Sequence, residues 1–359
     1  MRQATIDFQF VTPAFLGGAN QQAELRMPSV RGALRWWSRA MEYPVEDVFG
    51  TAPKNSTQAP AQASSVVLRD LSSYPLKTET ASVEQITGNR YDYFLWPFSR
   101  NARQFLPANT RCKFQITTRR QAELDERVLK TFLLLGSLGA RSRRAYGSIW
   151  PINVEIDGKQ WKIPTTIEEF RQELQKNVSL RSYCVILQIS EPQKTAEKAI
   201  QQCEKFLKTF RCGSKRSGTP SKWGKNDHDV IFSPEKQEVF RPILGLPLVQ
   251  TYSSSHRKLT TSIPNPNPDT DTDTDIDRLA SPLHFKIIPL REGKVPILTV
   301  FTIPSEIIEE DMKINICENG KLFASPKLSF ELIDLITDEK TLHRYLPYSK
   351  NLGEFPVEK

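Results

Sequence analysis

The chain has 359 residues, a formal net charge of +8 and a hydrophobic fraction of 38%. This length predicts two domains, and the hydrophobic fraction is sufficient for a core in each. The longest apolar run is far shorter than the ~20 residues of a membrane-spanning helix, and the five cysteines have no CxxC spacing. We therefore expect a cytoplasmic protein without a membrane segment, a disulfide framework or a zinc site.

The predicted elements of the first half form the order strand, helix, strands, helix, strand. The segments are Ala4–Phe10, a helix opened by Pro28 with Ser29 as N-cap, then Val66–Arg69, Tyr91–Trp96, Cys112–Thr118, Glu123–Leu135 and Ser148–Ile156. This order is typical of the split βαβ, ferredoxin-like (RRM-like) fold, in which an antiparallel sheet lies under two helices. The first half is therefore predicted to belong to the α+β class.

The second half partly repeats this order. Its predicted elements are a strand over Ser182–Ile189, a helix over Gln193–Phe210, a basic loop over 211–225, strands over Leu283–Pro289 and Pro296–Ile303, and a helix over Lys327–Ile336. Residues 262–278, with their prolines and Thr-Asp alternation, are expected to be a mobile insertion. We place the domain boundary so that the domains are residues 1–165 and 166–359.

The positive charge is concentrated in residues 101–150, which hold ten Lys or Arg and only three acids. Within this window, residues 136–147 combine glycines, three arginines and a tyrosine. Glycine allows a close backbone approach, arginine matches phosphate geometry, and a tyrosine ring offers a face for base stacking. No hydrolytic or redox centre needs this mixture, whereas a polyanion does. The alternatives are a loop that pairs with acids of a partner protein and a Tyr146 that only packs.

The first helix carries a second basic cluster. Arg31, Arg35 and Arg39 are spaced by four residues and lie opposite an apolar stripe that includes Leu34 and Trp37. Trp37 is therefore expected in the core, whereas Trp36 on the flank could pack or bind a ligand. The polar face has no acids, unlike the mixed-charge face of an ordinary solvated helix, which is the alternative interpretation. We expect this face of the helix to meet phosphates.

Three segments together resemble the RAMP superfamily, and more narrowly the first-numbered subunits of Cmr complexes from type III-B CRISPR systems. They are residues 12–19 (TPAFLGGA), 24–40 (ELRMPSVRGALRWWSRA) and 136–148 (GSLGARSRRAYGS), with a weaker match at 278–285 (RLASPLHF). One departure is Ala145, where the family often has glycine.

The resemblance implies two tandem ferredoxin-like domains and a place in a ribonucleoprotein. Such a subunit would contact CRISPR RNA and target RNA near the 3′ end of the guide, beside other RAMP subunits, and would not be the nuclease. The predicted RNA-binding residues are Asn20, Arg31, Arg35, Trp36, Arg39, Gly139, Arg141, Ser142, Arg143, Arg144 and Tyr146. A second basic loop, which would meet RNA, a neighbouring subunit or only solvent, contains Lys215, Arg216, Lys222 and Lys225.

We predict no catalytic residue, cofactor or metal. Asp227, His228 and Asp229 form a short metal-like motif, but the four histidines are scattered and supply no second ligand motif. The alternating aspartates of residues 269–277 lack the glycine and glutamate of a calcium loop. The alternative function is a metal-independent RAMP endoribonuclease, which needs a general base. No histidine is close in sequence to the glycine-rich loop or the first helix, and His284 is expected to pack in a strand.

Overall fold

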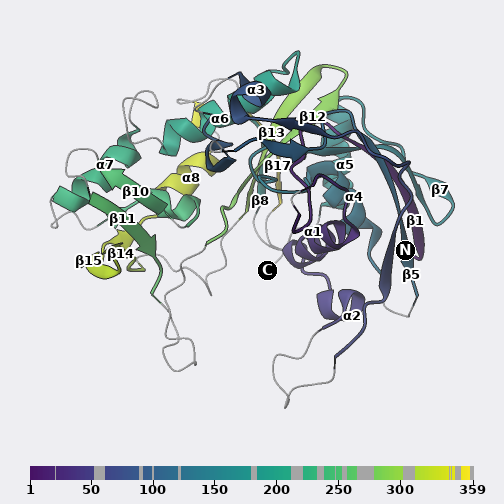
Figure 1. Ribbon diagram of the computed structural model, residues 1–359, viewed down its shortest axis with the longest axis horizontal. Coiled ribbons are helices and arrows are strands. Elements are labelled where there is room, and N and C mark those ends of the chain that lie inside the picture. The colour runs from purple at the N-terminus through teal and green to yellow at the C-terminus, as the bar shows by residue number, and fades with distance from the viewer. Residues whose placement is uncertain are drawn as a thin grey trace. The chain divides into compact units, whose positions relative to one another are not determined.

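The computed structural model describes most of the chain. The described residues are 1–20, 22–51, 61–88, 92–98, 101–119, 123–178, 184–211, 221–232, 238–246, 248–252, 257–264, 279–301, 312–338, 340, 342–343 and 349–355. The protein is a mixed α+β protein with antiparallel sheets (Figure 1). Its contacts define two compact units: unit 1 comprises Met1–Glu204, His284–Thr299 and Asn351–Lys359, and unit 2 comprises Lys205–Leu283 and Val300–Lys350.

The first sheet of unit 1 has five strands in the order β2-β5-β1-β6-β7. The strands are β1 (Gln3–Phe10), β2 (Val66–Asp70), β5 (Arg111–Thr118), β6 (Ile149–Ile156) and β7 (Lys159–Gln160). Every neighbouring pair is antiparallel, and in the central strand Ile6 pairs with Phe114 on one side and Val154 on the other. Alternate residues of β1 are buried, so the period-2 pattern of the sequence predicted this strand correctly.

Two helices cover one face of this sheet, α1 (Met27–Ala40) and α4 (Glu126–Leu135), and they pack side by side (Figure 1). The predicted apolar stripe of α1 is confirmed, because Leu34 and Trp37 are buried. The N-cap prediction is wrong: Arg26 precedes the helix, and Ser29 lies inside its first turn. Proline fits the first helical turn, where its missing N–H has no partner to lose, and so the helix begins before it.

The helix α4 begins later than the sequence indicated. Asp125 is its N-cap, and its carboxylate accepts a hydrogen bond from the backbone N–H of Arg127. Short elements lie between α1 and α4: α2 (Val45–Phe49), β3 (Glu79–Ala81), α3 (Val83–Thr87), the 3-10 helix η1 (Trp96–Phe98) and β4 (Arg103–Phe105).

The strand predicted over Tyr91–Trp96 is wrong. Tyr91 lies outside the described residues, and residues 93–95 form a turn that leads into η1. The side chain of Asp92 accepts a hydrogen bond of 2.7 Å from the backbone N–H of Leu95. Aspartate favours such turns because its carboxylate competes with regular backbone pairing.

The second sheet has four strands in the order β12-β13-β8-β17. The strands are β8 (Cys184–Gln188), β12 (Leu283–Leu290), β13 (Gly293–Phe301) and β17 (Lys350–Phe355), and most of their residues belong to unit 1. The hairpin of β12 and β13 and the helix α6 (Ala196–Arg211) follow the sequence prediction. The helix α5 (Ile167–Asn177) was not predicted; it buries Phe170 beside Trp150, with ring centroids 6.2 Å apart.

Unit 2 contains an antiparallel sheet of four strands in the order β10-β11-β14-β15. These are β10 (Leu248–Tyr252), β11 (Arg257–Ser262), β14 (Asn315–Glu318) and β15 (Lys321–Ala324), beside the parallel pair β9 (Glu238–Val239) and β16 (Lys327–Leu328). The unit also has α7 (Lys222–Phe232), η3 (Arg241–Leu244) and α8 (Glu331–Thr337). The start predicted for the last helix is wrong, because Lys327 and Leu328 pair with β9 instead.

Two further sequence predictions fall in unit 2 or beyond the described part. Of the insertion expected over residues 262–278, only its first three residues are described; 265–278 lie outside the described residues. The loop predicted over 211–225 is wrong in its last residues, because α7 begins after Ser221. The hydroxyl of Ser221 accepts a hydrogen bond from Gly224 N–H in the first turn of this helix.

None of the described helices combines the length and apolarity needed to cross a bilayer.

A buried ion pair ties α7 to η3. Nε of Arg241 lies 2.6 Å from the carboxylate of Asp227, and both side chains are buried. The same carboxylate accepts hydrogen bonds from the backbone N–H groups of Phe240 and Arg241. Both oxygens of Asp227 therefore have partners within unit 2, and this residue of the metal-like motif has a structural role.

Replacing Asp227 by alanine should strongly destabilise unit 2. The change leaves the Arg241 guanidinium buried without its carboxylate, which typically costs about 3–5 kcal/mol. Chemical denaturation of the purified protein measures the loss. The matched control is Asp229→Ala, because that side chain is about a third exposed. Equal stability losses in the two variants would contradict the structural role of the pair.

Candidate nucleic-acid interface

The glycine-rich loop, residues 136–147, is attached to the segment that follows β1. The backbone N–H of Ala140 donates to the carbonyl of Phe15 at 2.9 Å, and that of Gly147 donates to Pro13 at 2.8 Å. Within the loop, Leu138 N–H donates to the Gly147 carbonyl at 2.9 Å. These bonds close the loop on itself and against the β1–α1 connection.

The same loop is also attached to β12, at the edge of the second sheet. Ala145 N–H donates to the Phe285 carbonyl at 3.1 Å, and Phe285 N–H donates to the Arg143 carbonyl at 3.3 Å. The hydroxyl of Thr12 donates to the Ala145 carbonyl at 2.7 Å. The loop therefore joins three segments of unit 1 through main-chain atoms, and this fixes where its side chains begin.

Four residues of the loop have left-handed backbone conformations, with φ of 95° at Gly139, 65° at Arg141, 65° at Ala145 and 64° at Gly147. A Cβ on Gly147 would lie only 1.9 Å from the Leu138 carbonyl oxygen, so this position requires glycine. Ala145 adopts a backbone conformation that glycine tolerates best.

Arginine and aromatic side chains gather where the loop meets α1 and β12. The rings of Trp36 and His284 are stacked, with centroids 4.8 Å apart and an interplanar angle of 25°. The guanidinium carbon of Arg143 lies 5.8 Å from the centre of the Trp36 ring, and that of Arg144 lies 6.0 Å from Phe285. We call Trp36, Arg143, Arg144, His284 and Phe285 the arginine–aromatic cluster.

Electrostatics within the cluster keep its histidine neutral. Burial, followed by the charges of Arg143 and Arg144, holds the pKa of His284 well below its usual 6.5. Burial also lowers the pKa of Arg143, although a guanidinium remains charged at neutral pH. The cluster thus presents cationic forks beside a stacked, uncharged aromatic pair.

The third arginine of the loop, Arg141, lies near a different ring. Arg141 has its guanidinium carbon 5.8 Å from the Phe98 ring, where Arg103 lies at 4.1 Å. Both arginines are half-buried. Residue Arg103 was not among the predicted site residues, because nothing in the sequence indicates that it meets the loop.

The remaining predicted residues have different surroundings. Arg31 donates to the Val66 carbonyl at 3.2 Å, Arg35 is half-buried, and Arg39 is exposed. Asn20 is exposed, and its side-chain oxygen accepts from Gln22 N–H at 3.2 Å. Ser142 and Gly139 lie half-buried in the loop itself.

The stacking role expected of Tyr146 is wrong for this conformation. The side chain is 1% exposed, and its ring packs against Phe15 with centroids 5.6 Å apart. A base could stack on it only if the core opened. The packing alternative is therefore the one that the structure supports.

His284 packs in a strand, as predicted, but the sequence did not show what it packs against. It lies in β12, its ring stacks on Trp36 of the first helix, and the charges of Arg143 and Arg144 of the loop act on it. It lies 140 residues after Arg144, so only the pairing of β12 with the loop brings it there. The weaker block at 278–285, which ends on His284 and Phe285, was the available signal.

The second basic loop is only partly described. Lys215 and Arg216 lie outside the described residues. Lys222 and Lys225 are exposed on α7 in unit 2, where Nζ of Lys222 lies 3.5 Å from a Glu331 carboxylate oxygen. The expected loop at these two positions is thus a helical surface.

Comparison with known proteins shows similarity to two families. The RAMP superfamily model matches residues 7–150, and a model of the Cmr1 C-terminal domain matches residues 189–340. The chain is therefore similar to RAMP proteins over its first part and to Cmr1 proteins over its second part.

Individual relatives and solved structures are similar as well. CRISPR system Cmr subunit Cmr1-2 of Pyrococcus furiosus is 27% identical over 182 residues, which cover 42% of this chain and 95% of that protein. The apo crystal structure of Cmr1 from Pyrococcus furiosus shares the fold, with a TM-score of 0.53 and 16% identity over 98% of this chain and 99% of that one. A chain of the type III-B Cmr-beta complex bound to cognate target RNA and AMPPnP in the presence of ssDNA has a TM-score of 0.51 and 11% identity, covering 96% and 99%.

Gly147→Ala should destabilise unit 1 more than the same change at Gly158. Both glycines have positive φ, of 64° and 78°, so each alanine carries a conformational cost of about 1–2 kcal/mol. Only the Cβ at position 147 meets backbone, whereas nothing lies within 4 Å of a Cβ at position 158. Thermal unfolding of both variants measures the difference. Equal melting temperatures would contradict the close approach of Gly147 to Leu138.

Proposed function

We propose that this chain is a non-catalytic RNA-binding subunit of a type III-B CRISPR (Cmr) effector complex in antiviral defence. It would contact guide or guide–target RNA near the 3′ end of the guide. The observation that carries this proposal is the arginine–aromatic cluster, in which Arg143 and Arg144 project from a loop held by backbone hydrogen bonds.

The chemistry of the cluster suits a ribose–phosphate chain of any sequence. Guanidinium groups bind phosphate oxygens through paired donors, and their attraction is stronger where they are partly removed from water. The stacked rings of Trp36 and His284 are half-buried, so part of their surface is open to a base. A guide-binding protein needs such contacts because base edges vary between guides.

The strand orders support a tandem ferredoxin-like arrangement. In the first sheet the order β2-β5-β1-β6 places the first strand between the third and the fourth, and β12-β13-β8-β17 repeats that order. We infer that unit 2 consists of insertions into the second copy, before β12 and before β17. The first copy ends near β7, which supports a boundary close to residue 165.

The proposed partners are CRISPR RNA, target RNA and other RAMP subunits. Support comes from the Pyrococcus furiosus relative, which is described as a Cmr subunit. In such an assembly, Arg31, Arg35 and Arg39 of α1 would extend the basic surface. Lys222 and Lys225 would serve a neighbouring subunit or RNA from unit 2.

One observation favours the second candidate function, a metal-independent endoribonuclease. His284 lies beside Arg143 and Arg144, and its lowered pKa leaves a neutral imidazole that could accept a proton from a 2′-hydroxyl. The arginines would then stabilise the charge that develops on phosphorus-bound oxygens. We favour the binding role because the imidazole is stacked face to face on Trp36, which supports its ring.

Replacing both Arg143 and Arg144 by alanine should weaken RNA binding about equally for all sequences. For each phosphate that is no longer neutralised by an arginine, the slope of log affinity against log salt should fall by about 0.7. Fluorescence anisotropy with two unrelated single-stranded RNAs at several salt concentrations measures both effects. The control removes the same charge far from the loop in sequence, at exposed Arg2 and Lys159. Indistinguishable affinities and slopes for the two double variants would count against the proposed interface.

Incubation with labelled repeat RNA in EDTA should give no discrete products, either with the wild-type protein or with His284→Ala. Gel analysis over several hours is sufficient, with RNA binding checked in parallel by filter retention. Site-specific cleavage by the wild type that disappears in His284→Ala would establish the endoribonuclease and refute the non-catalytic role.

A further inference from the structure

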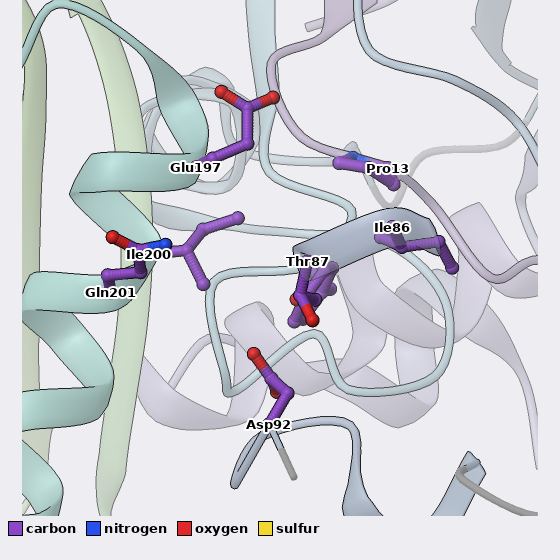
Figure 2. Close-up of a pocket in the computed structure, with 8 residues that line it drawn as sticks. Pro13, Ile86, Thr87, Asp92, Glu197, Ile200 and Gln201 are labelled. Carbon is purple, nitrogen blue, oxygen red and sulfur yellow. The ribbon is translucent and has the colours of Figure 1, made fainter. Parts of the chain in front are cut away.

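A small pocket lies behind the glycine-rich loop, within unit 1 (Figure 2). Three apolar side chains line it: Pro13 of the β1–α1 connection, Ile86 of α3 and Ile200 of α6. Two acids, Asp92 and Glu197, line it as well, together with Tyr146. Figure 2 shows Glu197 and Ile200 on one helix, opposite Pro13 and Ile86, with Asp92 below them.

We propose that this pocket receives a lysine or arginine side chain from a neighbouring protein subunit. It would be a protein-docking site, distinct from the arginine–aromatic cluster. The inference goes beyond RNA binding, and it rests on the proposed function only in taking the neighbour from an effector complex.

The pocket is acidic in a basic protein. Asp92 is 4% exposed, and burial together with the nearby Glu204 raises the pKa of Asp92 to about 6. Glu204 is itself held in place by Tyr93 N–H, which donates to its carboxylate at 3.1 Å. Two neighbouring carboxyl groups repel each other when ionised, and a bound cation relieves that repulsion.

Within the described residues, the lining contains no lysine or arginine. Lys294 is a cation that acts on Glu197 of the lining. Burial lowers the pKa of Lys294, and the charge of Glu197 opposes this effect. The two carboxylates therefore favour a cationic occupant over the phosphates of an RNA backbone. No described group of three acidic, cysteine or histidine side chains could hold a metal ion there.

Tyr146 supplies the second, independent indication of a ligand. Its side chain is 1% exposed, yet its hydroxyl makes no hydrogen bond with any described residue. Burial, followed by the charges of Asp92, Glu204 and Glu197, raises the pKa of Tyr146, which lines the same pocket as Asp92 and Glu197. Because Tyr146 borders the pocket, its hydroxyl oxygen is available to accept a hydrogen bond from an incoming N–H donor.

The two halves of the pocket match the two halves of a long cationic side chain. Lysine and arginine bury their methylene stems against apolar surface while the charged end bonds to acceptors. Here Pro13, Ile86 and Ile200 would contact the stem, and the carboxylates with Tyr146 would bind the end. Trp96, which follows the turn capped by Asp92, is 56% exposed, and an exposed tryptophan is typical of protein interfaces.

Methyl NMR of the full-length chain tests the proposal directly. The δ1-methyl groups of Ile86 and Ile200 should shift on titration with N-acetyl-arginine amide or N-acetyl-lysine amide, but not with neutral N-acetyl-norleucine amide or uridine monophosphate. The shifts should be lost in Asp92→Asn/Glu197→Gln and kept in Glu168→Gln, which removes a carboxylate at an exposed position of α5. Asparagine retains the acceptor for Leu95 N–H, so folding should be preserved.

Addition of the same variants to an effector complex that lacks this subunit tests the source of the side chain. The Asp92→Asn/Glu197→Gln variant should enter the complex at least tenfold more weakly than Glu168→Gln, while its own RNA affinity stays unchanged. The pocket assignment would be overturned if the methyl signals of Ile86 and Ile200 shifted with neither cationic amide, or shifted with uridine monophosphate instead. Equal incorporation of the variants would overturn the docking role. Failure of the wild-type protein to join any complex would refute both the proposed function and the docking role. The methyl titration would then still test whether the pocket binds a cationic side chain.

Discussion

Main-chain hydrogen bonds from the glycine-rich loop to two distant segments are the constraint on which the proposed interface depends. Ala140 bonds to Phe15 after the first strand, and Ala145 and Arg143 exchange bonds with Phe285 on β12. Because the partners are backbone atoms, the fold fixes the backbone positions of Arg143 and Arg144, from which their side chains extend. Their positions are thereby set before any ligand arrives, which lowers the entropic cost of binding.

The loop presents opposite chemistry on its two sides. Arg143 and Arg144 lie with Trp36 and His284, where burial and mutual charge keep the imidazole neutral. Two residues further on, Tyr146 turns inward to a pocket lined by Asp92 and Glu197. A polyanion suits the first side and a cationic side chain suits the second. One short segment could thus join RNA on one side to a protein neighbour on the other.

Sequence patterns predicted what depends on local periodicity. Strand β1 followed from alternation, and the buried Leu34 and Trp37 followed from helical spacing. Contacts made through tertiary pairing had no such signal: His284 reaches Trp36 only because β12 pairs with the loop, and Tyr146 is buried because Phe15 covers it. Side-chain competition explains other errors, such as the turn capped by Asp92 where a strand was expected. The residue type at position 145 does not indicate its positive φ, because alanine rarely adopts such a conformation.

Photocrosslinking with peptide mapping tests the central claim most directly. RNA carrying 4-thiouridine would be bound to the full-length chain, irradiated and digested, and the modified peptides identified by mass spectrometry. The account predicts crosslinks in the peptides that contain residues 136–147, Trp36 and His284. Crosslinks confined to unit 2, with those peptides recovered unmodified, would contradict it.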